Sequence, residues 1–132
     1  MNILLMAHSG LRWLILLVAV IAIIKFLIGW LGGGQFKGMD RGLMSGFSGL
    51  MDLQVTLGII VLLWNGFTGA GFPRYRLEHG LIMIAAAVVA HLSARWKTAD
   101  DTSRFRNNLF LIAGSLLLVV MGLLVLPGGL SR

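Results

Sequence analysis

The sequence contains no cysteine and few charged residues. The lack of cysteine excludes disulfide bonds, thiolate metal sites and catalysis by a thiol. Charged residues make up 12% of the 132 residues, whereas an ordinary soluble domain contains about 25%. Hydrophobic residues make up 58%, which leaves too few polar side chains to cover a soluble surface. We therefore expect the solvent of this chain to be a lipid bilayer.

Four long apolar segments follow one another along the chain. A membrane-spanning helix needs about 20 mostly apolar residues, and this is met by residues 3–31, 43–64, 77–96 and 109–126. Each segment is too long for a strand and lacks strict alternation, so helices are predicted. Short connections favour antiparallel neighbours. The predicted fold class is all-α: one transmembrane domain over residues 1–132, an up-down-up-down bundle of four helices.

The excess of basic residues predicts how the chain is oriented. The formal net charge is +6; in a membrane protein this indicates orientation and contact with anionic headgroups, so nucleic acid is not an expected partner. No basic residue precedes Arg12, so we expect a span there and not a cleaved signal peptide. Seven basic residues lie near loops one and three and four lie on the other side, which predicts that both termini are outside. The seven are Lys25, Lys37, Arg41, Arg95, Lys97, Arg104 and Arg106, and the four are Arg12, Arg74, Arg76 and Arg132.

The second segment carries a polar stripe. Ser45, Ser48, Gly49, Asp52 and Thr56 follow helical spacing and share one face. Small and polar residues favour contact with a neighbouring helix over contact with lipid, so Asp52 is predicted to face the interior of the bundle. Because an intramembrane carboxylate is functional by default, we interpret Asp52 as the catalytic residue, which handles a proton. The alternative is a polar side chain that sets the register of the helices.

Asp52 needs a partner unless it is protonated. An ionised Asp52 requires Lys25, Arg12 or His91 close by. The depth of His91 in the third segment makes an Asp52–His91 contact reasonable, and an Asp52–Lys25 contact is the alternative. His91 by itself is interpreted as a packing residue. Gln54 lies on nearly the opposite face from Asp52 and needs a partner of its own.

A second polar group is predicted at the outer interface. His8 and Arg12 are one helical turn apart, and Glu78 and His79 open the third segment. Imidazole and carboxylate are usual metal ligands, and two histidines on separate helices can hold a b-type haem with an arginine paired to a propionate. We predict these four as cofactor-binding residues, with His8 and His79 as haem-iron ligands. The alternative is that they are interfacial residues surrounded by water and headgroups.

Four stretches of the chain resemble a known group of proteins. HSGLRW, the Lys25…Gly29-Trp30 segment, DLQVTLG and EHGLIMIAAAVVAH are together similar to small bacterial four-helix membrane proteins that are often labelled cytochrome-b-like. The resemblance covers most of the chain and implies a bacterial inner membrane, electron transfer and haem b. In that pattern the position of Asp52 is either Asp or His, and the Asp form argues against a haem ligand on the second helix.

These observations predict a small integral membrane redox component that holds a b-type haem or a quinone near the outer leaflet. One alternative is a non-catalytic accessory subunit of a larger respiratory or photosynthetic membrane complex. Another is a small oligomeric protein that handles ions or protons through Asp52. The expected partners are the lipid bilayer and either further copies of the chain or other membrane subunits. Whether the protein is an enzyme is left open.

Overall fold

Four long helices account for most of the computed structural model, which describes residues 2–129. They are α1 (Asn2–Gly32), α2 (Gly38–Asn65), α3 (Arg74–His91) and α4 (Asp101–Leu124). Two short helical turns follow α2 and α3: η1 (Gly66–Ala70) and η2 (Leu92–Trp96). Arg132, which contributed to the predicted orientation, lies outside the described residues.

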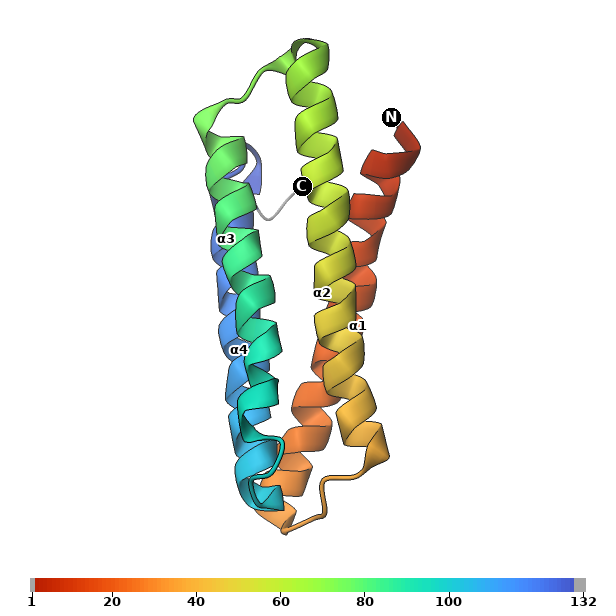
Figure 1. Ribbon diagram of the computed structural model, residues 1–132, viewed down its shortest axis with the longest axis vertical. Helices are drawn as coiled ribbons and strands as arrows, with labels where there is room; N and C mark the ends of the chain where they lie inside the picture. The colour runs from red at the N-terminus through yellow and green to blue at the C-terminus, as the bar shows by residue number, and fades with distance from the viewer. Residues whose placement is uncertain (1, 130–132) are drawn as a thin grey trace.

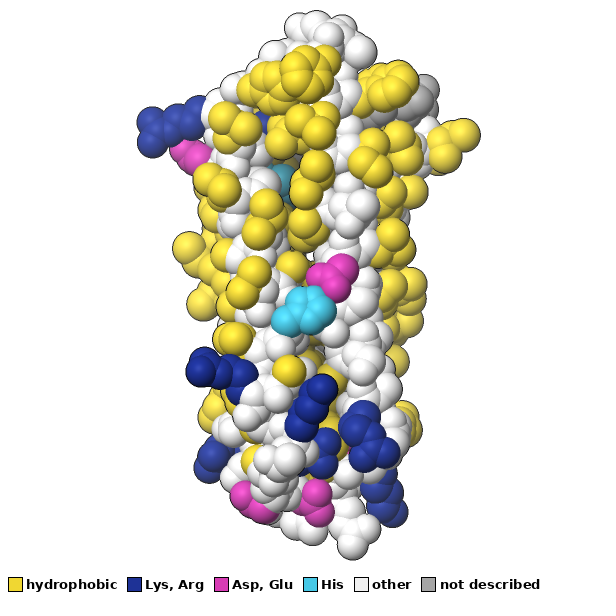
Figure 2. Space-filling view, in the orientation of Figure 1, with side chains coloured by type: hydrophobic (Ala, Val, Ile, Leu, Met, Phe, Trp, Pro, Cys, Tyr) yellow, Lys and Arg dark blue, Asp and Glu magenta, His cyan; other side chains and the backbone are white. Residues whose placement is uncertain are grey.

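The helices pack antiparallel in an up-down-up-down arrangement (Figure 1). Both α1 and α3 pack against α2 and α4, so α1 and α3 occupy diagonal positions. All four helices are long and apolar enough to cross a membrane, which confirms the predicted all-α transmembrane bundle. The α1–α2 and α3–α4 connections lie at one end, where most Lys and Arg side chains gather (Figure 2). We call this the basic end, and the opposite end, with the N-terminus and η1, the terminal end.

The predicted apolar span of residues 109–126 is only part of the fourth helix. The helix α4 begins at Asp101 and not at Leu109, because Asp100 caps it: the Asp100 side chain accepts a hydrogen bond of 3.2 Å from the backbone N–H of Ser103. The added turns are amphipathic, and they place Phe105 in the core. The hydrophobic run of the sequence therefore marked only the part of α4 that is apolar on all sides.

The apolar core occupies the half of the bundle nearer the basic end. The rings of Phe26, Phe36 and Phe105 lie 5.1–6.0 Å apart between centroids. Buried alanines of α1 and α3 form the next layer: Ala19, Ala22, Ala86 and Ala90. Toward the terminal end, burial of apolar side chains stops at one level on every helix, at Ile15, Met51, Ala86 and Ile112. Beyond that level no described apolar side chain is fully buried.

A buried carboxylate joins α1 and α2 at the basic end. The Asp40 side chain has no exposed surface, and it accepts a hydrogen bond of 2.9 Å from the backbone N–H of Lys37, which caps α2. It also forms an ion pair of 2.9 Å with the Lys25 ammonium. Lys25 therefore contacts Asp40, and the predicted alternative of an Asp52–Lys25 contact is wrong.

The orientation can be tested by labelling, because the chain has no native cysteine. Cysteine is introduced singly at Gln35, in the α1–α2 connection, or at Ala70, near the α2–α3 connection; both positions are exposed. Gly71 is avoided because its φ of 68° strains any larger residue. We expect Ala70→Cys to react with an impermeant maleimide on intact cells and Gln35→Cys to react only after lysis. The reverse pattern would show that the termini are inside.

Candidate functional site

Polar side chains from three helices lie where the apolar core ends. We call His8 and Arg12 of α1, Gln54 of α2 and His79 of α3 the terminal-end cluster. The Gln54 amide donates a hydrogen bond of 2.7 Å to the backbone carbonyl of His8, which provides the partner that Gln54 was predicted to need. The bond ties α2 to α1 next to the imidazole. Gln54 was not predicted as a site residue, although its polarity inside an apolar run was the available signal.

The His8 ring lies close against the backbone of α2. A Cβ atom built on Gly58 would lie 3.0 Å from Cε1 of His8, closer than atoms normally approach. A larger residue at position 58 would therefore require the imidazole to shift by a few tenths of an ångström. Gly58 follows Gln54 by one helical turn, so the same face of α2 holds both the backbone and the ring of His8.

Three buried polar atoms of the cluster make no hydrogen bond within the described part of the chain. They are Nδ1 of His8, Nε of Arg12 and Oε1 of Gln54. A buried polar atom without a partner destabilises the fold by about 1–3 kcal/mol, and such groups are rare in folded proteins and often mark functional sites. The Arg12 guanidinium also lies 5.0 Å from the centroid of the Trp13 ring. Its planar face therefore contacts the indole, and its N–H groups remain as hydrogen-bond donors.

His79 and Glu78 are placed differently from one another. The ring Nδ1 of His79 lies 2.7 Å from the backbone carbonyl of Gly122 on α4. Because a carbonyl can only accept, Nδ1 carries the proton and the lone pair of the ring is on Nε2. Glu78 instead pairs with Arg74 on the surface of α3, at 2.6 Å. The structure therefore separates Glu78 from the other predicted members of this site.

A carboxylate–imidazole pair lies on the surface between α2 and α3. Nε2 of His91 lies 2.8 and 2.7 Å from the two carboxylate oxygens of Asp52, which confirms the predicted contact. The two side chains are 51% and 55% exposed, Asp52 and His91 respectively. An imidazole and a carboxylate are visible side by side at about mid-height in Figure 2, with hydrophobic side chains above them. Such a pair can hold or share a proton at a depth where hydrocarbon surrounds the protein.

The prediction that Asp52 faces the interior is wrong for the single chain. The core face of α2 is formed by Met44, Phe47 and Met51, and the polar stripe lies to one side of it. Four of the five stripe residues are exposed: Ser45, Gly49, Asp52 and Thr56. A stripe of small and polar residues identifies a face that avoids lipid, but it does not say whether the covering element belongs to the same chain.

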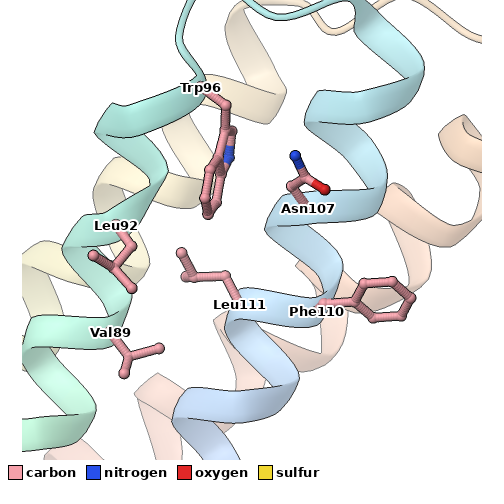
Figure 3. A pocket seen from close by; sticks show the side chains of 6 residues that line it. All are labelled: Val89, Leu92, Trp96, Asn107, Phe110 and Leu111. Atoms are coloured by element: carbon pink, nitrogen blue, oxygen red, sulfur yellow. The ribbon is translucent and has the colours of Figure 1, made fainter.

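A shallow apolar groove lies between α3 and α4 (Figure 3). Its volume is about 380 Å³. It is lined by Val89, Leu92, Trp96, Asn107, Phe110 and Leu111. With a single polar side chain in its wall, the groove offers contact to an apolar chain and no reactive group.

No cluster of three or more His, Asp or Glu side chains suited to a metal ion occurs among the described residues. Comparison of the chain with protein-family models, with curated proteins and with solved structures finds no match in any of the three. A proposed function therefore rests on the terminal-end cluster and on the Asp52–His91 pair.

Proposed function

We propose that this protein is a small membrane redox component that holds an electron-carrying cofactor at the terminal-end cluster. One observation carries the proposal: the buried apolar core stops where three buried polar atoms of His8, Arg12 and Gln54 lack partners. Apolar surroundings with a few convergent polar groups are typical of cofactor sites. In a bundle, such sites are built in the core from side chains on facing helices.

A b-type haem is the first candidate cofactor. When bound, it supplies one-electron transfer. His8 and His79 would hold the iron and Arg12 would pair with a propionate. Two features support this assignment. The helices that carry the two histidines are diagonal in the bundle, and the hydrogen bond from Nδ1 of His79 to the Gly122 carbonyl is of the kind that orients metal-ligating histidines.

A quinone is the second candidate, and a different observation favours it. The Arg12 guanidinium can only donate hydrogen bonds, and its buried Nε lacks an acceptor among the described residues. The carbonyl oxygen of a quinone headgroup supplies such an acceptor without any need for metal ligands. The Asp52–His91 pair then serves as a proton-handling group for either cofactor, because reduction of a quinone takes up protons and a haem can couple its charge to a nearby carboxyl.

The absorption spectrum of the purified protein tests the cofactor. After expression with ample haem, we expect a Soret band that His8→Ala or His79→Ala abolishes and that His91→Ala largely preserves. His91 is the matched control because it is the third histidine of the chain and lies outside the cluster. Wild-type protein without visible absorption would exclude haem. A quinone in the lipid extract of that colourless protein, lost in Arg12→Gln and kept in the exposed Arg74→Gln, would support the second candidate.

An accessory subunit of a larger membrane complex is the competing function. The observation that favours it is the exposed stripe of α2, which includes the half-exposed Asp52. Another helix packed over this face, from a second copy or from a different subunit, would remove these polar groups from lipid. A colourless protein that co-purifies with other subunits in mild detergent, and that carries no quinone, would support this function over the redox one.

A further inference from the structure

A basic cavity lies at the basic end between the first turn of α2, η2 and the first turns of α4. Its volume is about 440 Å³. It is lined by three cationic residues, Arg41, Lys97 and Arg104, together with Phe36, Met44, Ser45, Ser93, Trp96 and Asn108. None of the lining residues is acidic. The cavity thus combines a concentrated positive charge with polar and aromatic walls.

Part of this lining is held in place by specific side-chain contacts. The Arg104 guanidinium lies 4.2 Å from the centroid of the Phe36 ring, and Phe36 is itself buried in the aromatic core. The indole N–H of Trp96 donates a hydrogen bond of 2.7 Å to the side-chain oxygen of Asn108. Asn108 is buried, and with its oxygen engaged it offers the cavity a donor NH₂ group. The wall therefore presents donors and cations to whatever occupies it.

Two nearby acids, Asp40 and Asp100, are engaged away from the cavity, and a third, Asp101, does not line it. Asp40 is buried and forms its ion pair with Lys25. Asp100 accepts hydrogen bonds from the backbone N–H and the hydroxyl of Ser103. The positive charge of Arg41, Lys97 and Arg104 is therefore available to an external anion.

The apolar groove of Figure 3 adjoins this cavity. Trp96 lines both the groove and the basic cavity, so one indole forms a shared wall. The rest of the groove is formed mainly by Val89, Leu92, Phe110 and Leu111. Tryptophan is typical of the membrane–water interface, where headgroups meet acyl chains. A cationic cavity beside an apolar groove at that level matches a molecule with an anionic head and a hydrocarbon tail.

We propose that this composite site binds one anionic phospholipid. Its phosphate lies in the cavity among Arg41, Lys97 and Arg104, and one acyl chain lies along the groove past Trp96. A guanidinium recognises phosphate oxygens through paired N–H groups, and basic pockets between membrane helices bind lipid headgroups in this way. The groove distinguishes a lipid from free phosphate, because only a lipid has a chain to fill it. The site does not depend on the cofactor of the terminal-end cluster.

Native mass spectrometry of the full chain tests the lipid site. The protein is titrated in detergent with phosphatidylglycerol or with phosphatidylcholine of the same acyl chains. We expect one tightly retained phosphatidylglycerol. The double variant Arg41→Gln/Lys97→Gln should weaken its binding about 25-fold, since each cation near a headgroup contributes about fivefold. The matched control is Arg95→Gln/Arg106→Gln, which removes the same charge from exposed residues that line neither the cavity nor the groove, and it should bind as the wild type does.

Three results would overturn the proposal. An equal loss of affinity in the control pair would show that general surface charge attracts the lipid. Equal retention of both lipids by the wild type would show that no anionic headgroup is recognised. Displacement of phosphatidylglycerol by millimolar inorganic phosphate would assign the cavity to a free anion. If the double variant does not fold, the variant Ser93→Leu is used to test the site, because leucine fills the cavity without changing any charge. Wild-type lipid affinity in Ser93→Leu would also contradict the proposal.

Discussion

Replacing Asp40 by alanine is expected to lower the free energy of unfolding by about 3 kcal/mol. The carboxylate has no exposed surface, and it holds both the Lys25 ammonium and the backbone N–H of Lys37, each at 2.9 Å. Its removal leaves the first turn of α2 without a cap and Lys25 without its counter-charge. Denaturation in mixed micelles, followed by circular dichroism at increasing SDS concentration, measures the change.

Two further variants isolate the ion pair from the cap. Lys25→Met leaves Asp40 buried without a counter-charge and should destabilise the protein by a comparable amount. Asp100→Ala is the matched control, since Asp100 also caps a helix but is exposed, so its effect should be clearly smaller. Hydrogen bonds from Ser103 hold the pKa of Asp100 below its ordinary value. The contribution of Asp100 to the stability of the fold is therefore present at neutral pH, and it is lost as the pH falls through that lowered pKa. If Asp40→Ala and Asp100→Ala lower the free energy of unfolding equally, the burial of Asp40 adds nothing to its effect on stability.

The second large effect is expected at the Asp52–His91 pair. His91→Leu leaves the carboxylate of Asp52 alone on a lipid-facing surface and should destabilise the protein by about 2.5 kcal/mol, the lower limit for an acid at the centre of a span. The double variant Asp52→Leu/His91→Leu removes both polar groups and should recover the wild-type stability or exceed it. The same micelle titration measures all three proteins. A double variant less stable than His91→Leu would show that the face is covered by protein.

The conservative variant Asp52→Asn separates the proton role from the fold. Asparagine keeps the shape of the side chain and a hydrogen bond to His91, but it cannot titrate. We expect Asp52→Asn to fold like the wild type. If the proposed cofactor is bound, the variant should lose the dependence of the cofactor's reduction potential on pH, which reaches about 59 mV per pH unit when one proton accompanies one electron. Thr56→Val is the matched control, one helical turn away on the same stripe. An unchanged pH dependence in Asp52→Asn would remove the proton role from this pair.

The residue pattern predicted some parts of the site because they depend on helical spacing alone. An Asp52–His91 contact was one of two predicted alternatives, since the depths of these residues in two antiparallel helices match, and the structure brings them to 2.7 Å. Gln54 was predicted to need a partner since an amide in hydrocarbon requires one, and it donates to the His8 carbonyl. Depth and the need for hydrogen bonds are properties of the local sequence, so both could be read without coordinates.

Composition and the length of the apolar runs predict a membrane protein of four helices, because they set which solvent and which secondary structure are possible. The packing of the four helices against one another set which way each helix face turns. It placed Asp52 on the surface and Asp40 in the interior, it paired Lys25 with Asp40, and it separated Glu78 from the terminal-end cluster. The physical reason is that rotation of a helix about its axis depends on how all its neighbours pack. In a bilayer, apolar residues on a helix face lipid and core alike, so hydrophobicity does not distinguish the two sides.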